Sequence, residues 1–362
     1  MDALAGPTDV IWDVTYACPL RCSHCYSESG RRAARQLGHG EMLEVADAIV
    51  SLGPRSVEFA GGEPLLVKGI HEVAERIARA GIEVNLYTSG WTFTREMAGE
   101  ITRAFSRITV SVDGATAEVH DRVRGRAGSF GRAMDTLAVL DAVSRRRVAS
   151  GAPTLEFGID CAVIRSNLHQ LEEFCSEIAP RFPGMSFLTF AAAVPSGLAS
   201  RPGFGELELL INDQIRALTS PETERRLRAA APASVSVRPS DNFVLMMHPM
   251  MVEDGSALPL MQIEPDGEVR AMPIYEGIVG NILKEDPALL WQRAVARWSD
   301  PFVVEALTPV RSMAQWAEAT RRIDHHFGTD EVRARIDRRP AYTGPATPRN
   351  RGDGSVTLVS AG

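Results

Sequence analysis

Residues 56–90 read SVEFAGGEPLLVKGIHEVAERIARAGIEVNLYTSG, and this stretch holds two β-like runs with a helical pattern between them. The runs at residues 56–60 and 83–88 are short and rich in β-branched or aromatic residues, which predicts strands. Apolar residues recur at helical spacing before Gly81, at Ile70, Val73, Ala74 and Ile77. A strand, a helix and a strand in this order are typical of a βαβ unit with parallel strands.

The same alternation continues on both sides of this unit. Further runs predict strands at residues 10–16, 107–112, 155–164 and 185–190, with helical patterns between them. Six such units predict an α/β fold with repeated βα units around a parallel sheet over residues 1–200. The length of the chain allows either one barrel, here a partial (β/α)6 TIM-type barrel, with an appendage, or two ordinary domains. Beyond residue 200 we expect a helix and linker over residues 201–240, a smaller α+β extension over residues 241–305, and a C-terminal helix with a mobile tail over residues 306–362.

Composition and charge exclude several classes of protein. A hydrophobic fraction of 44% with 23% charged residues is typical of a globular chain. No apolar run approaches the ~20 residues that span a bilayer, and the first residues lack the pattern of a secretory signal. We therefore expect no membrane contact and a cytoplasmic location. The formal net charge of -7 gives no basic surface for nucleic acid, and the short basic run at residues 31–35 favours a solvated loop over a docking patch.

Three of the five cysteines lie close together in CPLRCSHC, at Cys18, Cys22 and Cys25. Grouped thiolates select zinc or an iron-sulfur cluster. A closed zinc site needs four ligands, and His24 could supply the fourth only with strain because it lies between two of the others. Three ligands leave one coordination position open, which is typical of a reactive site. The remaining two, Cys161 and Cys175, are interpreted as small buried hydrophobes.

The cysteine motif CPLRCSHC resembles the CxxxCxxC motif of the radical S-adenosylmethionine (SAM) superfamily. In that family the three cysteines bind three irons of a 4Fe-4S cluster, and the amino and carboxylate groups of SAM chelate the fourth. The resemblance implies catalytic and metal-binding roles for Cys18, Cys22 and Cys25, with the backbone around His24 near the adenine.

Other strand ends carry further parts of this resemblance. The segment Gly61, Gly62, Glu63 and Pro64 looks like the GGEP motif that binds the SAM amino group, although a simple turn before a helix also fits it. The ends of parallel barrel strands share one rim, where such barrels place their active sites. Ser89, Ser111 and Arg165 follow successive strands and resemble the positions that hold the ribose and the SAM carboxylate, while local turn or capping roles stay open for each.

The C-terminal part resembles the frame of a SPASM-type extension, in which cysteines bind auxiliary clusters. The segments IEPDGEVRAMP and GNILKEDPALLW match this frame, but Met272 occupies an expected ligand position and no cysteine follows Cys175. Because a lone thioether cannot replace a set of thiolates, we expect a single 4Fe-4S cluster and a degenerate extension.

The resemblance implies an enzyme that takes an electron from a flavodoxin- or ferredoxin-type donor and cleaves SAM to a 5'-deoxyadenosyl radical. That radical would abstract hydrogen from a carbon of a specialised metabolite or peptide. Without an auxiliary electron acceptor, redox-neutral outcomes are favoured: epimerisation, rearrangement, elimination or radical addition. The alternatives are oxidation or cross-linking of a ribosomally made peptide, and a non-catalytic iron-sulfur or zinc sensor.

Two further observations bear on this expected activity. Tyr87 and Cys161 are candidate hydrogen donors to a product radical. About seventeen residues precede Cys18, which leaves no room for an N-terminal peptide-recognition domain and weakens the expectation of a peptide substrate.

Overall fold

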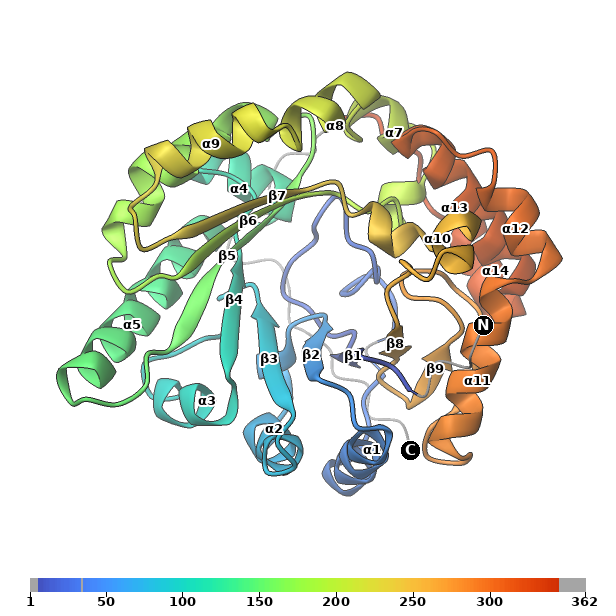
Figure 1. Cartoon of the computed structure of the whole chain (residues 1–362), viewed down its shortest axis with the longest axis horizontal. Coiled ribbons are helices and arrows are strands. Elements are labelled where there is room, and N and C mark those ends of the chain that lie inside the picture. Colours follow the sequence, from blue (N-terminus) through green and yellow to red (C-terminus); the bar gives the residue numbers. More distant parts are fainter. Residues whose placement is uncertain (1–5, 34, 345–362) are drawn as a thin grey trace.

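The computed structural model describes residues 6–33 and 35–344, and its centre is one curved sheet (Figure 1). The sheet has ten strands in the order β10-β9-β8-β1-β2-β3-β4-β5-β6-β7. Neighbouring strands from β1 to β6 are parallel, which confirms the predicted partial barrel. These strands are β1 (Asp9–Thr15), β2 (Ser56–Gly61), β3 (Glu83–Thr88), β4 (Arg107–Ser111), β5 (Glu156–Val163) and β6 (Phe187–Ala192).

Both edges of the barrel sheet are extended by later parts of the chain. Strand β7 (Ser236–Ser240) pairs in parallel with β6, and β8 (Leu260–Ile263) pairs in parallel with β1. Strands β9 (Glu268–Arg270) and β10 (Ile278–Asn281) follow in antiparallel order. The β8–β9 hairpin therefore continues the barrel sheet, where the sequence suggested only a smaller neighbouring unit.

The segment after residue 218, interpreted from the sequence as a linker, is regular structure. It forms helix α9 (Pro221–Ala230) and then β7. Ser220 caps α9 through a hydrogen bond from the backbone N–H of Thr223, and Pro221 suits the first turn of the helix. The linker interpretation was wrong because Pro and Ala were taken as signs of irregular chain, whereas Pro is tolerated at a helix start and on an edge strand.

Helices cover the outer side of the curved sheet (Figure 1). The barrel helices are α1 (His39–Leu52), α2 (Ile70–Ala78), α3 (Ala98–Ala104), α4 (Ala117–Arg124), α5 (Ser129–Ala149) and the short α6 (Leu171–Glu173). The later helices are α7 (Phe204–Leu207), α8 (Asn212–Leu218), α10 (Pro249–Glu253), α11 (Pro287–Trp298), α12 (Pro301–Leu307), α13 (Met313–Phe327) and α14 (Asp330–Asp337). Of the predicted tail at residues 338–362, residues 345–362 lie outside the described residues. In the described part the tail prediction was wrong, because Arg339 and Tyr342 are buried.

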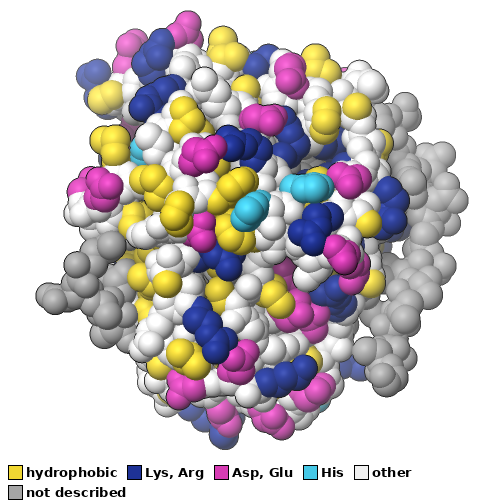
Figure 2. Space-filling view, turned by 90° about the vertical axis from the view of Figure 1, so that its right-hand side faces the viewer, with side chains coloured by type: hydrophobic (Ala, Val, Ile, Leu, Met, Phe, Trp, Pro, Cys, Tyr) yellow, Lys and Arg dark blue, Asp and Glu magenta, His cyan; other side chains and the backbone are white. Residues whose placement is uncertain are grey.

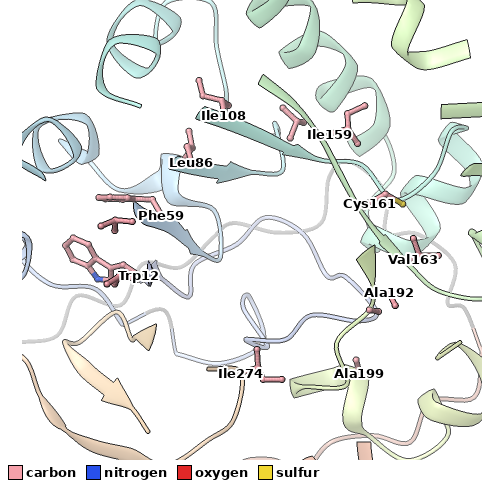
Figure 3. Close-up of a cluster of buried hydrophobic side chains, with 14 of the residues drawn as sticks. Trp12, Phe59, Leu86, Ile108, Ile159, Cys161, Val163, Ala192, Ala199 and Ile274 are labelled. Carbon is pink, nitrogen blue, oxygen red and sulfur yellow. The ribbon is translucent and has the colours of Figure 1, made fainter. Parts of the chain in front are cut away.

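A layer of apolar side chains joins the strands to the helices. Figure 3 shows Trp12, Phe59, Leu86, Ile108 and Ile159, one from each of five neighbouring strands, as part of this layer. Strand side chains alternate between the two faces of a sheet. The residues between these apolar positions, among them Glu58, Tyr87 and Asp160, therefore face the inside of the barrel. The alternation gives the barrel an apolar outside and a partly polar inside.

No helix among the described residues is long and apolar enough to cross a membrane. The face turned toward the viewer in Figure 2 carries acidic, basic and hydrophobic side chains interspersed with one another. On that face the basic side chains form no continuous patch, as expected from the negative net charge.

Candidate active site

The loop that follows β1 brings the three clustered cysteines to one cavity. Cys18, Cys22 and Cys25 all line this cavity, whose volume is about 320 Å³. The loop lies inside the arc of strands (Figure 1). Of the strand-end residues singled out in the sequence, the cavity is also lined by His24, Gly61, Gly62, Ser89 and Ser111. The structure thus gathers residues from the ends of four strands around the three thiols.

Neighbouring segments hold the cysteine loop through its backbone. The N–H groups of Arg21 and Ser23 donate to the carbonyl groups of Arg124 and Val123, at 3.0 and 2.9 Å. On the other side, the N–H of Leu198 donates to the carbonyl of Cys25 at 3.0 Å. Because backbone hydrogen bonds fix the loop in the middle and at the end of the motif, the thiols are held in position by the fold.

The two glycines after β2 are required by the closeness of this loop. A Cβ atom at Gly62 would lie 2.1 Å from the carbonyl oxygen of Ala17, and one at Gly61 would lie 2.6 Å from that of Thr15. Gly61 also has a φ of +109°, which side chains with a Cβ rarely adopt. In this structure the glycines permit close approach between β2 and the cysteine loop.

The fully buried Glu63 is hydrogen-bonded to Ser89, which lines the cavity. The Glu63 carboxylate accepts hydrogen bonds from the Ser89 N–H at 2.9 Å and from the Thr88 hydroxyl at 2.8 Å, and it also accepts one from the Ser89 hydroxyl. Burial raises the pKa of Glu63, and these donors oppose that shift. Pro64 is buried and begins a short 3-10 turn, Pro64–Leu66. Glu63 therefore fixes the third strand end beside the GGEP segment.

A buried ionic group supports the second cysteine. Arg124, at the end of α4, forms an ion pair with Asp113 at 2.7 Å, and its Nη1 lies 3.7 Å from the Cys22 sulfur. Burial raises the pKa of Cys22, while the Arg124 guanidinium acts in the opposite direction and favours the thiolate. Nε2 of His24 lies 3.4 Å from the same Asp113 carboxylate, and burial lowers the pKa of His24.

The sequence analysis did not single out Asp113 and Arg124, although both follow the fourth predicted strand. Asp113 is the acid of SVDG, and Arg124 lies in the following DRVRGR. The opposite charges of Asp113 and Arg124 after one strand could have indicated this site, because charged side chains are rarely buried without a partner.

Arg165 is not brought to the cavity. Its Nη1 donates to the carbonyl of Glu206 at 2.6 Å, and its backbone N–H donates to the carbonyl of Glu208 at 2.8 Å. The turn around α7 therefore engages this arginine on the outside of the rim. Among the arginines of the described residues, Arg124 lines the cavity instead.

The arrangement of the thiols fits an iron-sulfur cluster better than one zinc ion. A tetrahedral zinc ion with Zn–S bonds of about 2.3 Å holds its sulfurs about 3.8 Å apart. Among the described residues, the only group of three metal-ligand side chains with ligand atoms within 4.8 Å of one another is Glu264, Asp266 and Glu268. At least one pair of the three cysteine sulfurs therefore lies more than 4.8 Å apart, which is wider than the ligands of one zinc ion and fits thiolates that bind separate irons.

Comparison with known proteins identifies the domain around this cavity. A family model described as the radical SAM superfamily matches residues 12–155. The chain carries the domain of a radical SAM enzyme. The match confirms the expected radical SAM family for this domain, and the family implies a 4Fe-4S cluster and SAM as cofactors.

Two curated relatives match this radical SAM domain over part of their length. Mycofactocin maturase MftC of Mycolicibacterium smegmatis is 33% identical over 180 residues, which are 49% of this chain and 43% of the relative. An AdoMet-dependent heme synthase of Methanosarcina barkeri is 31% identical over 194 residues, 53% of this chain and 52% of the relative. The chain thus spans about half the length of the curated relatives that it matches.

Solved structures show the same fold. Streptococcus suis SuiB bound to S-adenosylmethionine superposes with a TM-score of 0.60 and 15% identity, over 82% of this chain and 67% of SuiB. SuiB bound to its precursor peptide SuiA superposes with a TM-score of 0.60 and 14% identity, over 87% of this chain and 71% of SuiB. The similarity extends beyond the barrel to the later strands and helices.

Proposed function

We propose that this radical SAM enzyme reductively cleaves SAM at a single 4Fe-4S cluster and uses the 5'-deoxyadenosyl radical to take hydrogen from a substrate carbon. Cys18, Cys22 and Cys25 would hold the cluster. The observation that carries this proposal is the convergence of the three thiols with Gly62, Ser89 and other strand-end residues around one cavity. The bound cofactors would supply the radical chemistry, and the protein supplies position and exclusion of water.

The chain's own residues prepare the site in three ways. Arg124 lies beside Cys22 and favours its thiolate form, which is the form that binds metal. Gly62 allows the backbone of the GGEP segment to approach the cysteine loop. The Glu63 carboxylate, linked to Ser89, is interpreted as a group that orients the rim next to the SAM amino group.

The C-terminal hairpin supports a single cluster. Met272, at the position expected for a cluster ligand, is 2% exposed within the hydrophobic core. Next to it, the Arg270 guanidinium forms an ion pair with Glu264 at 2.8 Å. Side chains that are already packed and paired occupy the place where thiolates would be needed, and the sequence has no cysteine after Cys175.

The proposed substrate class is a peptide or a specialised metabolite, and the electron donor is of the flavodoxin or ferredoxin type. A maturase among the relatives and a peptide-bound structure among the similar folds favour a peptide. A redox-neutral outcome is proposed because only one cluster is proposed; oxidation or cross-linking of a peptide is the alternative. Of the two candidate hydrogen donors, Tyr87 lines the cavity, whereas Cys161 is fully buried in the core layer (Figure 3).

The test is anaerobic reconstitution with iron and sulfide, followed by iron counting and an assay for 5'-deoxyadenosine with dithionite and SAM. We expect about four irons per chain and release of 5'-deoxyadenosine. Eight or more irons would contradict the single-cluster proposal. Iron binding without SAM binding would instead support a non-catalytic sensor, and no 5'-deoxyadenosine with any candidate substrate would contradict the proposed activity.

A further inference from the structure

The inner wall of the barrel carries two carboxylates that the cluster and SAM do not account for. Glu58 on β2 and Asp160 on β5 both line the cavity, and Tyr87 on β3 lines it between them. All three interrupt apolar strands, at positions where the alternation turns them inward. Charged side chains on the inner face of a barrel cost free energy unless a partner is present, so they indicate a ligand.

Asp160 has no partner of its own. Among the described residues, no cation lies within 4 Å of its carboxylate and no donor forms a hydrogen bond with it. The two nearest arginines are engaged elsewhere, since Arg124 pairs with Asp113 at 2.7 Å and Arg107 pairs with Glu156 at 2.8 Å. Burial and the Asp113 charge raise the pKa of Asp160 to about 7, as expected for a carboxyl group without a compensating cation.

Glu58 is only half satisfied. Asn85 and Ser56 donate to one of its oxygens, Oε1, at 2.8 and 3.2 Å. Both donors are neutral, so they leave the charge of Glu58 uncompensated and its second oxygen free to accept another hydrogen bond. Burial raises the pKa of this carboxyl group as well.

The part of the cavity wall next to Asp160 is apolar and made of small residues, because β6 pairs directly with β5. The end of β6 and the chain after it contribute Ala191, Ala192, Ala193 and Val194, and Leu245 and Ile274 lie on the same cavity. Alanines leave room for a substrate stem and offer no hydrogen bonds to it. The cavity therefore combines an anionic wall with an apolar wall.

We propose that this cavity binds a substrate through a protonated amine, with Asp160 as the anionic hydrogen-bond partner, Glu58 as a second acidic group on the same cavity, and the alanine wall against an apolar stem. The inference rests on the proposed function, because it assigns the substrate class of the same site. The amine would form the charge-assisted hydrogen bonds that the Asp160 carboxylate lacks. A lysyl side chain of a peptide and a free alkylamine share this chemistry.

The test uses the full-length, reconstituted holoenzyme with SAM bound, at pH 8, where Asp160 is ionised. Calorimetric titration compares n-butylamine with its neutral and acidic analogues, 1-butanol and butyrate. We expect n-butylamine to bind about tenfold more tightly than 1-butanol and butyrate not to bind. Equal affinity for the amine and the alcohol, or tighter binding of butyrate, would overturn the inference.

Variants of Asp160 and Glu58 test whether these carboxylates cause the preference for n-butylamine. Asp160→Asn should weaken n-butylamine binding by about tenfold or more, and Glu58→Gln should weaken it in the same direction. Asp47→Asn is the matched control, because Asp47 is half-exposed on the surface and pairs with Arg76. Unchanged binding by Asp160→Asn would overturn the inference.

A second arm separates the two sources of the amine. Nα-acetyl-lysine methylamide tests a peptide side chain, and its Nζ-acetylated form should lose binding because it lacks the charge. The same preparations are assayed for 5'-deoxyadenosine. If they release it but show no preference for amines, the substrate inference fails alone; if they release none, the proposed function fails.

Discussion

The loop after β1 and the hairpin formed by β8 and β9 extend from adjacent, parallel strands of one sheet, yet their polar groups are used differently. The cysteine loop turns three thiols toward a cavity and leaves them without covalent partners. In the hairpin, Arg270 pairs with Glu264 at 2.8 Å and lies 3.5 Å from Glu276. The difference separates a region kept open for ligands from one stabilised by internal ion pairs.

An ionic contact joins the two regions. Glu28, just after the last cysteine of the motif, accepts from Arg335 of α14 at 2.6 Å, and Arg335 also pairs with Glu276 at 2.7 Å. The arginines of the run at residues 31–35 belong to the same contact. Arg31 donates to the carbonyl of Cys22 at 3.2 Å, and Arg35 pairs with Asp266 at 2.9 Å. The described residues of this run form a loop with an exposed Arg31, as interpreted, but Arg32 and Arg35 are partly buried and pair with carboxylates.

The largest expected effect comes from removing a thiol. Cys22→Ala should abolish cluster binding and lower 5'-deoxyadenosine release by roughly 1000-fold or more, because each thiolate binds its own iron. Iron counting and product analysis measure both effects. Cys175→Ala is the control, since Cys175 is buried in the core away from the cavity and should leave the iron content unchanged. Equal iron loss in both variants would contradict the assignment of the cluster to the cysteine loop.

The next effect concerns the hairpin. Arg270→Gln should lower the free energy of unfolding by about 3 kcal/mol, because the buried Glu264 loses its nearest cation and Glu276 keeps only Arg335. The thiols themselves are untouched, so protein that remains folded should still bind about four irons. Urea unfolding measures the stability change. The exposed pair of Arg79 with Glu75 provides the matched control, and Arg79→Gln should cost less than about 1 kcal/mol.

A smaller effect tests how closely the cysteine loop packs. Gly62→Ala should cost about 2–3 kcal/mol and reduce iron content, because its Cβ would lie 2.1 Å from the Ala17 carbonyl oxygen. Gly131→Ala, within α5 where a Cβ meets no atom within 4 Å, should instead stabilise the protein by about 1 kcal/mol. Full iron occupancy in Gly62→Ala would show that the loop tolerates displacement.

The smallest expected effect is a pH dependence from the cavity wall. The pKa of Asp160 is about 7 when folded against a model value of 3.8, so the folded state binds its proton more tightly. The stability that this proton contributes is present below about pH 4 and is lost as the pH rises toward 7. Asp160→Asn does not titrate and so avoids this loss. The free energy of unfolding of the variant, relative to that of the wild type, should therefore rise by about 2 kcal/mol between pH 4 and pH 8. Urea unfolding at both pH values measures it, and a pH-independent difference would contradict the raised pKa.

The barrel could be predicted from the sequence because its signals are local. Strand β3 has the predicted bounds, and β1 and β5 differ from theirs by one residue at each end. The pairing of β8 with β1 could not be predicted, since no local pattern records which edge a distant strand will join. Strand β7 was interpreted as linker for the same reason. It is short and contains Pro239, and no local pattern shows that it pairs with β6.

The site was predictable only in part. The spacing of the motif predicted that the cysteines share one site, and the positions of Ser89 and Ser111 after strands predicted that they lie on the same cavity. Arg165 was assigned by its position after a strand, but its side chain is engaged by the turn at α7, which is 41 residues away in the sequence. Asp160 and Glu58 could have been recognised in the sequence as acidic residues within apolar strands, but the sequence analysis did not use this pattern.

The position of β1 between β2 and β8 has a consequence for how the protein is made. Asp13 of β1 bonds to Gln262 of β8, a residue 249 positions later in the chain. At a synthesis rate of about 5–20 residues per second, roughly 10–50 s pass on the ribosome before that partner exists. During this interval one edge of β1 is open, and the loop beside it is accessible from that side. A nascent chain of this protein therefore has a defined window in which iron and sulfide could enter before the last strands cover β1.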